Sequence, residues 1–190
     1  MTADARHINM SKIRGKDTKP EVTVRRFLHA DGYRFRKNIR TPPGTPDIVL
    51  SKYRTCIFVN GCFWHGHDGC KYYTHPKTHP EFWEEKVKRN KERDALVMAR
   101  LEALGWSVIT VWECELKNDK LGSTITAVEG QLHRNIQIWE EYKMKRKTDR
   151  AFALEEIRKR RAVREVVEAE LHEEYKIPKR IVKMSKKINQ

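Results

Sequence analysis

The sequence predicts an α/β fold with a central sheet flanked by helices, and three observations lead to this prediction. Apolar residues recur at helical spacing in three segments of the first 140 residues, and short β-rich runs lie between those segments. Glycines and prolines punctuate the boundaries. The hydrophobic content of 38%, with 5 Trp, 6 Tyr and 6 Phe, is sufficient for a packed core and excludes wholesale disorder.

The first helix is expected from Pro20 to about Ala30. Thr18 or Lys19 lies near its N-terminal cap. Pro20 suits the first turn, and the helix dipole favours the carboxylate of Glu21 there. A glycine two residues beyond Ala30 ends the helix.

Three short strands are expected next. Tyr33 to Arg36 alternates aromatic and basic residues, as a half-buried strand does. A proline-rich loop follows over 41–46. Residues 47–50 and 55–59 are then apolar and β-rich, and because only 51–54 separate them, a hairpin is the simplest arrangement.

The rest of the first 140 residues is predicted to form a helix, a strand and a second helix. Residues 84–104 have a helical pattern that a glycine closes, 106–112 resemble a buried strand, and 123–139 place apolar side chains on one helix face. From Lys143 to Tyr175 there is no glycine or proline, and good helix formers dominate, so a further helix is expected.

Charge divides the chain near residue 140. Residues 141–190 hold 16 Lys and Arg against 9 Asp and Glu, whereas all 9 glycines precede them. We therefore expect a globular domain over 1–140 and a basic, mainly helical extension over 141–190. The total charge of +14, with a pI near 9.7, favours a polyanionic partner such as nucleic acid. No apolar run is long enough to cross a membrane, and four cysteines without a secretory signal indicate reduced thiols.

A dense group of metal-ligand residues lies between positions 62 and 70. Cys62 and Cys70 offer thiolates, and either His65 or His67 offers a third ligand of the kind that Zn²⁺ prefers. The fourth ligand must come from elsewhere, and Cys114 is a candidate because it follows the strand 106–112. The alternative is that these residues are simply buried thiols and loop histidines. A fourth cysteine, in the middle of the apolar run 55–59, is interpreted as a small buried hydrophobic residue.

A second candidate site is Asp47, which precedes the hairpin. A carboxylate at the mouth of a strand is a typical Mg²⁺ ligand in nucleases, although an ordinary turn would also explain it. A second ligand near Val59-Asn60, a base such as His65, and Glu21 from the first helix would complete a catalytic site.

Aromatic side chains in polar loops form a third candidate. Phe63 and Trp64 lie in the glycine- and histidine-rich loop, and Phe82-Trp83 precedes the helix 84–104. In a basic protein such rings can stack on bases or wedge between them, whereas packing against the body is the alternative.

Taken together, these motifs resemble the very short patch repair endonucleases. The likeness spans roughly residues 8–140 in unbroken order, and the pairing of Gly-Cys-Phe-Trp-His with Trp-Glu-Cys is its most specific part. The segments that carry it are Asn9-Met10-Ser11 to Glu21, Pro46-Asp47, Phe58-Val59-Asn60-Gly61-Cys62-Phe63-Trp64-His65, Phe82-Trp83 with Lys91-Glu92-Arg93-Asp94, and Leu104-Gly105-Trp106 to Trp112-Glu113-Cys114.

The resemblance implies a restriction-endonuclease-like core, a structural zinc ion and Mg²⁺-dependent nicking of duplex DNA. Members of the family recognise a T·G mismatch left by deamination of 5-methylcytosine and cut the strand 5′ to the mispaired T. By position, Asp47 matches the metal-binding catalytic aspartate, His65 the catalytic histidine and Glu21 the glutamate of the active site. The other matched positions are the zinc ligands Cys62, His67, Cys70 and Cys114 and the intercalating aromatics Phe63, Trp64 and Trp83.

The chain departs from the family in two places. Val59-Asn60 stands where a Thr-His pair precedes the Gly-Cys, so that a Mg²⁺ contact from this position would use the backbone carbonyl of Val59. The zinc loop carries one extra residue, around Asp68-Gly69.

The hypothesis from sequence is thus a T·G mismatch-directed DNA nicking endonuclease. Its cofactors are catalytic Mg²⁺ and structural Zn²⁺, its partner is duplex DNA with a T·G mismatch, and its place is the bacterial cytoplasm, at the nucleoid. Two alternative functions stay open: a restriction-like nuclease with another target, and a zinc-stabilised DNA-binding module without catalysis. The sequence also leaves open additional partners among the mismatch-repair proteins.

Overall fold

The computed structural model describes residues 15–39, 43–74 and 76–175. The motif residues at 9–11, part of the proline-rich loop 41–46 and the basic end after Tyr175 lie outside these ranges. The helices and strands are α2 (Lys19–Ala30), β1 (Arg36–Lys37), β2 (Ile48–Leu50), β3 (Thr55–Asn60), α3 (Pro80–Ala103), β4 (Ser107–Trp112), α4 (Lys120–Thr148) and α5 (Arg150–Tyr175), with two 3-10 turns, η1 (Ser51–Tyr53) and η2 (Glu113–Leu116).

Four strands form one mixed sheet in the order β1-β2-β3-β4. The predicted hairpin is confirmed: β2 and β3 pair antiparallel, with Ile48 opposite Ile57. β4 pairs parallel to β3, with Val59 opposite Val111, after the long crossover that a parallel connection requires.

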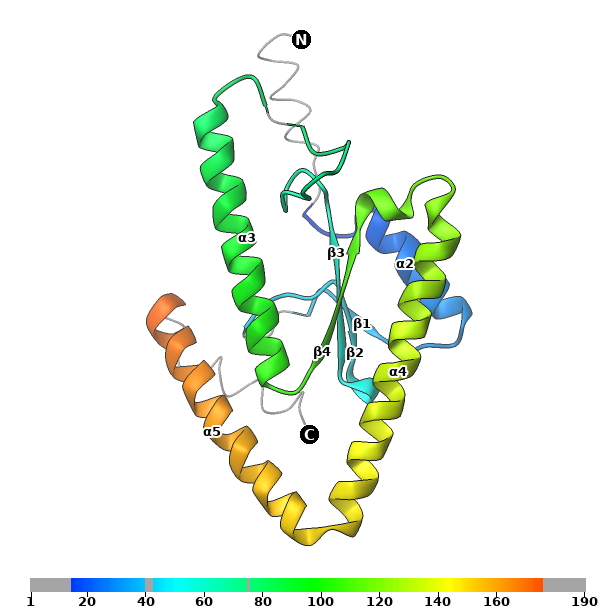
Figure 1. The fold of residues 1–190 in the computed structure, drawn as a ribbon, viewed down its shortest axis with the longest axis vertical. Helices are drawn as coiled ribbons and strands as arrows, with labels where there is room; N and C mark the ends of the chain where they lie inside the picture. Colours follow the sequence, from blue (N-terminus) through cyan, green and yellow to red (C-terminus); the bar gives the residue numbers. More distant parts are fainter. Residues whose placement is uncertain (1–14, 40–42, 75, 176–190) are drawn as a thin grey trace.

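The sheet lies between helices on both faces, which confirms the α/β class (Figure 1). Because neighbouring residues of a strand point to opposite faces, β2, β3 and β4 each contribute to two apolar cores. One core is covered by α2 and α4 and includes Val24, Leu28, Ile48, Ile57, Ile109, Val128 and Leu132. The other core is covered by α3 and includes Val49, Cys56, Val97, Leu101 and Trp106. Cys56 is therefore the buried hydrophobic residue that its position in an apolar run predicted.

The predicted strand over Tyr33 to Arg36 is wrong in position, because only Arg36–Lys37 pairs with β2. The backbone N–H of Tyr33 donates to Leu28 O at the end of α2, and its ring is buried in the core under α2. Gly32, with φ +79°, makes this tight helix ending possible. Residues 31–33 therefore form the C-terminal cap of α2, where the alternation of residues predicted the start of a strand.

The helices of the second half are longer than predicted. α3 begins at Pro80, four residues before the expected start, and α4 runs from Lys120 to Thr148 without a break at residue 140. The predicted helix over 143–175 is interrupted at Asp149, whose backbone is extended and whose Oδ1 accepts the N–H of Phe152. Asp149 thereby caps the start of α5, a position that aspartate favours.

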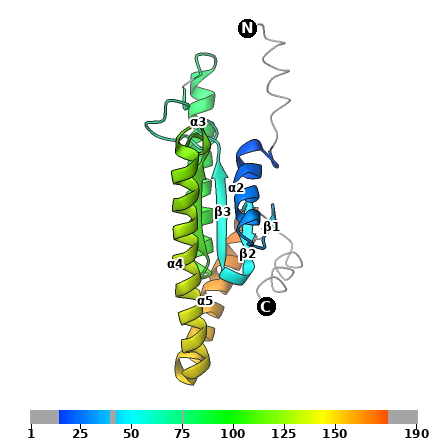
Figure 2. The same ribbon diagram turned by 90° about the vertical axis from the view of Figure 1, so that its right-hand side faces the viewer.

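α5 folds back toward the globular domain at one end of the sheet, and the loop 61–70 lies at the opposite end (Figure 1). Figure 2 shows α4 running the height of the sheet and beyond it to the turn where α5 begins. The guanidinium of Arg160 lies 4.7 Å from the ring centre of Tyr142 and 5.7 Å from that of Trp139, and Arg54 stacks on the same Trp139 ring. Glu170 pairs with Arg100 of α3 at 3.1 Å. Cation–π contacts and an ion pair therefore fasten the extension to the domain.

Within the described ranges, no helix combines the length and the apolar character needed to cross a membrane.

Candidate active site and metal centre

One end of the sheet gathers most of the predicted site residues. Asp47 stands directly before β2, Val59-Asn60 ends β3, and Cys114 follows the end of β4. Since β2 runs antiparallel to β3 and β4 runs parallel to it, the start of β2 and the ends of β3 and β4 meet at this edge. The strand order therefore brings residues that are far apart in sequence close together in space.

Asp47 is held against the end of β3. Its Oδ2 accepts the backbone N–H of Val59 at 2.7 Å, which leaves its other oxygen for a further ligand. Burial, with the charge of Glu21 as a smaller cause, raises the pKa of Asp47 to about 6. The Val59 hydrogen bond and the charges of His65 and Arg25 act in the opposite direction. A partly buried carboxylate with nearby negative charge is an environment that favours a bound cation.

Glu21, predicted to act in catalysis, is buried at the start of α2 and forms a capping box with Thr18. Its Oε1 accepts the Thr18 hydroxyl at 2.8 Å, and its Oε2 accepts the backbone N–H of Asp17 at 3.0 Å. Glu21 therefore has a structural role that explains its position in the helix. Its charge still acts on Asp47, which places it beside the candidate site.

His65 is paired with an acidic residue that the sequence reasoning did not single out for the site. Its Nδ1 contacts Oδ2 of Asp94 on α3, and both side chains are largely buried. Burial alone would raise the pKa of Asp94, but the hydrogen bond and charge of His65, together with Arg93, lower it. An ionised Asp94 holds a proton on Nδ1 and leaves Nε2 of His65 as the nitrogen that can accept one. Asp94 lay within the Lys91–Asp94 motif, but no local pattern linked it to a histidine 29 positions earlier.

α3 fixes the loop 61–70 along its length. Asn90 Nδ2 donates to the carbonyl of Trp64 at 2.8 Å, and Lys91 pairs with both carboxylate oxygens of Asp68 at 2.8 Å. Gly66 has φ +59°, and a Cβ added there would lie 2.5 Å from Val87. Glycine is therefore required for α3 to approach this closely.

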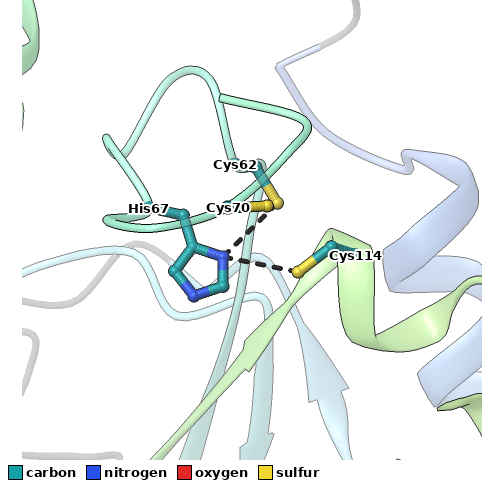
Figure 3. Close-up of side chains that lie close together, drawn as sticks. All are labelled: Cys62, His67, Cys70 and Cys114. Atoms are coloured by element: carbon teal, nitrogen blue, oxygen red, sulfur yellow. Dashed lines mark hydrogen bonds between the residues drawn. The ribbon is translucent and has the colours of Figure 1, made fainter. Parts of the chain in front are cut away.

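The four residues predicted as zinc ligands converge at the end of this loop (Figure 3). One ligand atom from each of Cys62, His67, Cys70 and Cys114 lies within 4.8 Å of all the others. Nδ1 of His67 is 3.7 Å from Cys62 Sγ and 3.4 Å from Cys114 Sγ. Those separations are close to the edges of a tetrahedron built with metal–sulfur distances of about 2.3 Å and metal–nitrogen distances of about 2.0–2.1 Å. The donor set can therefore hold one metal ion with no open coordination position.

His65 is not part of this group, although it lies between two of its members in sequence. The His67 ring stacks instead on Trp112 at 4.0 Å between ring centres and 6° between planes, which fixes its orientation. Burial raises the pKa of the Cys62 thiol to about 12, so a cation is needed to hold this cysteine as a thiolate at neutral pH.

The predicted DNA-binding aromatics form one cluster at the same end of the molecule. Phe63 lies 5.2 Å from both Trp64 and Trp83, and Trp64 lies 5.8 Å from Trp83. Phe82 adds to the cluster and is 53% exposed, while the ammonium of Lys86 lies 5.4 Å from the Trp83 ring. The rings are only partly buried and pack mainly on one another, so they present a cationic aromatic surface beside the site.

Comparisons with known proteins agree with this geometry. The model of the family DNA mismatch endonuclease Vsr matches residues 1–72. The chain is 52% identical over 117 residues to Type II nicking enzyme V.NmeAIP of Neisseria meningitidis serogroup A, covering 62% of this chain and 83% of that protein. It is 44% identical over 136 residues to Type II nicking enzyme V.XorIIP of Xanthomonas oryzae pv. oryzae, covering 72% and 94%.

A third relative is the DNA mismatch endonuclease Vsr of Escherichia coli, which is 44% identical over 109 residues, or 57% of this chain and 69% of that protein. The described site and these similarities identify a DNA endonuclease, which is a hydrolase. The chain belongs to the very short patch repair (Vsr) endonuclease family.

Proposed function

We propose that this endonuclease nicks duplex DNA 5′ to the mispaired T of a T·G mismatch produced by deamination of 5-methylcytosine, in the bacterial cytoplasm at the nucleoid. The observation that carries the proposal is the placement of Asp47 and the His65–Asp94 pair at one sheet edge, next to the aromatic cluster. A relative named as a DNA mismatch endonuclease supports the choice of a mismatch as the target.

Asp47 and the backbone carbonyl of Val59 are the proposed ligands of a catalytic Mg²⁺. Carboxylate and carbonyl oxygens are the ligands that this cation prefers, and when bound it stabilises charge on the scissile phosphate and on the leaving oxygen. Nε2 of His65 accepts the proton of the attacking water, because Nδ1 is engaged by Asp94. Glu21 contributes negative charge beside Asp47. The proposed zinc ion at Cys62, His67, Cys70 and Cys114 is structural, because three thiolates and one imidazole leave no position for water.

A nicking assay on three duplexes tests this function. We expect Mg²⁺ to support a single nick in a T·G duplex and none in the matched C·G and T·A duplexes. Equal cutting of all three would favour a restriction-like nuclease with another target. Binding of the T·G duplex without cleavage, in Mg²⁺ or Mn²⁺, would favour a DNA-binding module.

The aromatic cluster is proposed to detect the mismatch. Inserting a ring beside a base pair costs a few kcal/mol of unstacking, and a T·G wobble opens more easily than a matched pair. We therefore expect Trp64→Ala and Trp83→Ala to lower the ratio of affinities for T·G over T·A duplexes by more than tenfold, a change of about 1.4 kcal/mol. Fluorescence anisotropy with both duplexes measures this ratio, and Phe35→Ala, at a ring outside the cluster, is the control. An unchanged ratio would mean that the cluster serves packing alone.

The extension 141–190 is proposed to strengthen binding to any DNA sequence. Its net charge of +7 is concentrated after Tyr175, where residues 176–190 hold six Lys and Arg and no Asp or Glu. We expect removal of 176–190, which leaves α5 in place, to weaken matched and mismatched DNA equally and to reduce the slope of log affinity against log salt. Each lost phosphate contact lowers that slope by about 0.9. Replacing the six basic residues by Gln should reproduce the truncation; an unchanged slope in both variants would exclude DNA contact by this segment.

A further inference from the structure

Arg25, on α2, is a buried cation among acidic residues of the candidate site. It is 8% exposed, although arginine is rarely buried this far without a specific partner. Nη2 pairs with Oδ1 of Asp17 at 2.7 Å, and Nη1 lies 3.6 Å from Oε2 of Glu21. The charge of Arg25 also acts on Asp47. One guanidinium therefore contacts two carboxylates, Asp17 and Glu21, and its charge reaches a third, Asp47.

The contacts of Arg25 fix the carboxylate of Glu21 from a second side. The capping box already holds Glu21 through Thr18 and the N–H of Asp17, and Arg25 ties Asp17 and Glu21 together across one helical turn. Lys37 of β1 joins the same Asp17 oxygen at 3.3 Å, so the group links α2 to the sheet. Asp17 itself has φ +54°, a conformation that its ion pairs compensate.

Helix capping alone does not explain the buried arginine. The Thr18–Glu21 box satisfies the start of α2 without a cation, and a buried ion pair contributes little net stability after its desolvation cost. Nη1 is within ion-pair distance of Glu21 but has no hydrogen-bond acceptor among the described residues. A cation in this place instead allows Glu21 and Asp47 to remain close together as neighbouring negative charges.

We propose that Arg25 is a positioning residue for the endonuclease reaction, holding the Glu21 carboxylate in place beside Asp47. The inference rests on the proposed roles of Glu21 and Asp47. It does not depend on which mismatch the enzyme recognises.

A double-mutant cycle on the nicking rate tests this proposal. The variants are Arg25→Met, Glu21→Gln and the two combined, assayed with excess enzyme on whichever duplex of a matched and mismatched panel the wild-type protein cuts fastest. Arg25→Met should slow nicking by about tenfold or more, as loss of a positioning partner does around a metal site, with the Kd for DNA within about threefold. If Arg25 acts through Glu21, the combined variant should be no slower than the slower single variant.

Three controls separate positioning from general stability. Lys52→Met removes an exposed cation outside this group and should leave the nicking rate unchanged. Val128→Ala, in the core under α4, should lower Tm at least as much as Arg25→Met does. At temperatures below its Tm, this variant should nick at the wild-type rate. Arg25→Lys keeps the charge and should recover part of the rate. Wild-type nicking of Arg25→Met, or multiplicative losses in the combined variant, would overturn the inference. The panel separately reports on the proposed T·G specificity.

Discussion

Replacing Asp47 by Asn should slow nicking severely while the fold and the DNA affinity persist. The substitution keeps the size of the side chain and an oxygen that can accept the Val59 N–H, but it removes the charge of a proposed metal ligand. Lewis-acid stabilisation by a bound metal supplies several kcal/mol, so the nicking rate should fall on the order of a thousandfold. Single-turnover nicking in Mg²⁺ and in Mn²⁺, with binding measured on the same duplex, checks both halves of this prediction.

The difference in stability between wild type and Asp47→Asn should depend on pH in a defined direction. The pKa of Asp47 is raised to about 6 from 3.8, first by burial, so the folded state binds a proton more tightly than the unfolded chain. This contribution to stability is complete below about pH 4 and is lost as pH rises through 6. Without divalent cations, the variant should therefore match wild type at pH 4 and have a higher Tm at pH 8.

Addition of Mg²⁺ at pH 8 should then raise the Tm of wild type but not that of Asp47→Asn, because only the wild-type site offers an ionised carboxylate. Leu132→Ala, a core variant far from Asp47 in sequence, controls for general destabilisation and should retain the Mg²⁺ response. Near-normal nicking by Asp47→Asn would remove this residue from the active site. So would a Mg²⁺-dependent Tm shift of equal size in the variant and in wild type.

Local sequence was sufficient for the parts of the site that lie within one motif or at one strand end. Asp47 is predicted as a site residue because a carboxylate next to an apolar run can be recognised from the sequence alone. The metal cluster was expected because three of its members lie within nine positions of one loop. Even so, composition alone left the choice between His65 and His67 open, and the resemblance to a known family resolved it. The structure brings the predicted four together.

The parts that sequence did not predict depend on tertiary packing. Asp94 pairs with His65 only because α3 packs along the loop 61–70, and Arg25 reaches Asp17 only because the turn before α2 folds back. Hydrophobic periodicity likewise does not predict the break between α4 and α5 at Asp149. A single cap residue inside a run of good helix formers leaves the periodic pattern almost unchanged. The partner of His65 comes from a segment 29 positions away, and the partners of Arg25, although near in sequence, depend on how the turn before α2 folds.

The two histidines of the loop should respond oppositely to substitution, and this is the sharpest test of the metal centre. We expect one zinc ion per wild-type chain. His67→Ala removes a ligand whose Nδ1 faces two thiols, so it should lose the zinc and unfold the loop together. Each kcal/mol lost lowers Tm by about 2–4 °C in a chain of this size, and a drop of at least about 10 °C is expected.

His65→Ala should instead keep the zinc and the Tm while nicking falls by about 10²–10⁴-fold, the usual loss for a general base. Its ring contacts Asp94 rather than the thiols, although it lies two positions from His67. Elemental analysis after dialysis, thermal unfolding with and without a chelator, and single-turnover nicking distinguish the two variants. Cys114→Ser serves as a matched control, because its ligand comes from after β4 and its loss should reproduce the phenotype of His67→Ala. Zinc loss in His65→Ala with retention in His67→Ala would reverse the assignment. Unchanged Tm in metal-free wild type would show that the cluster has no structural role.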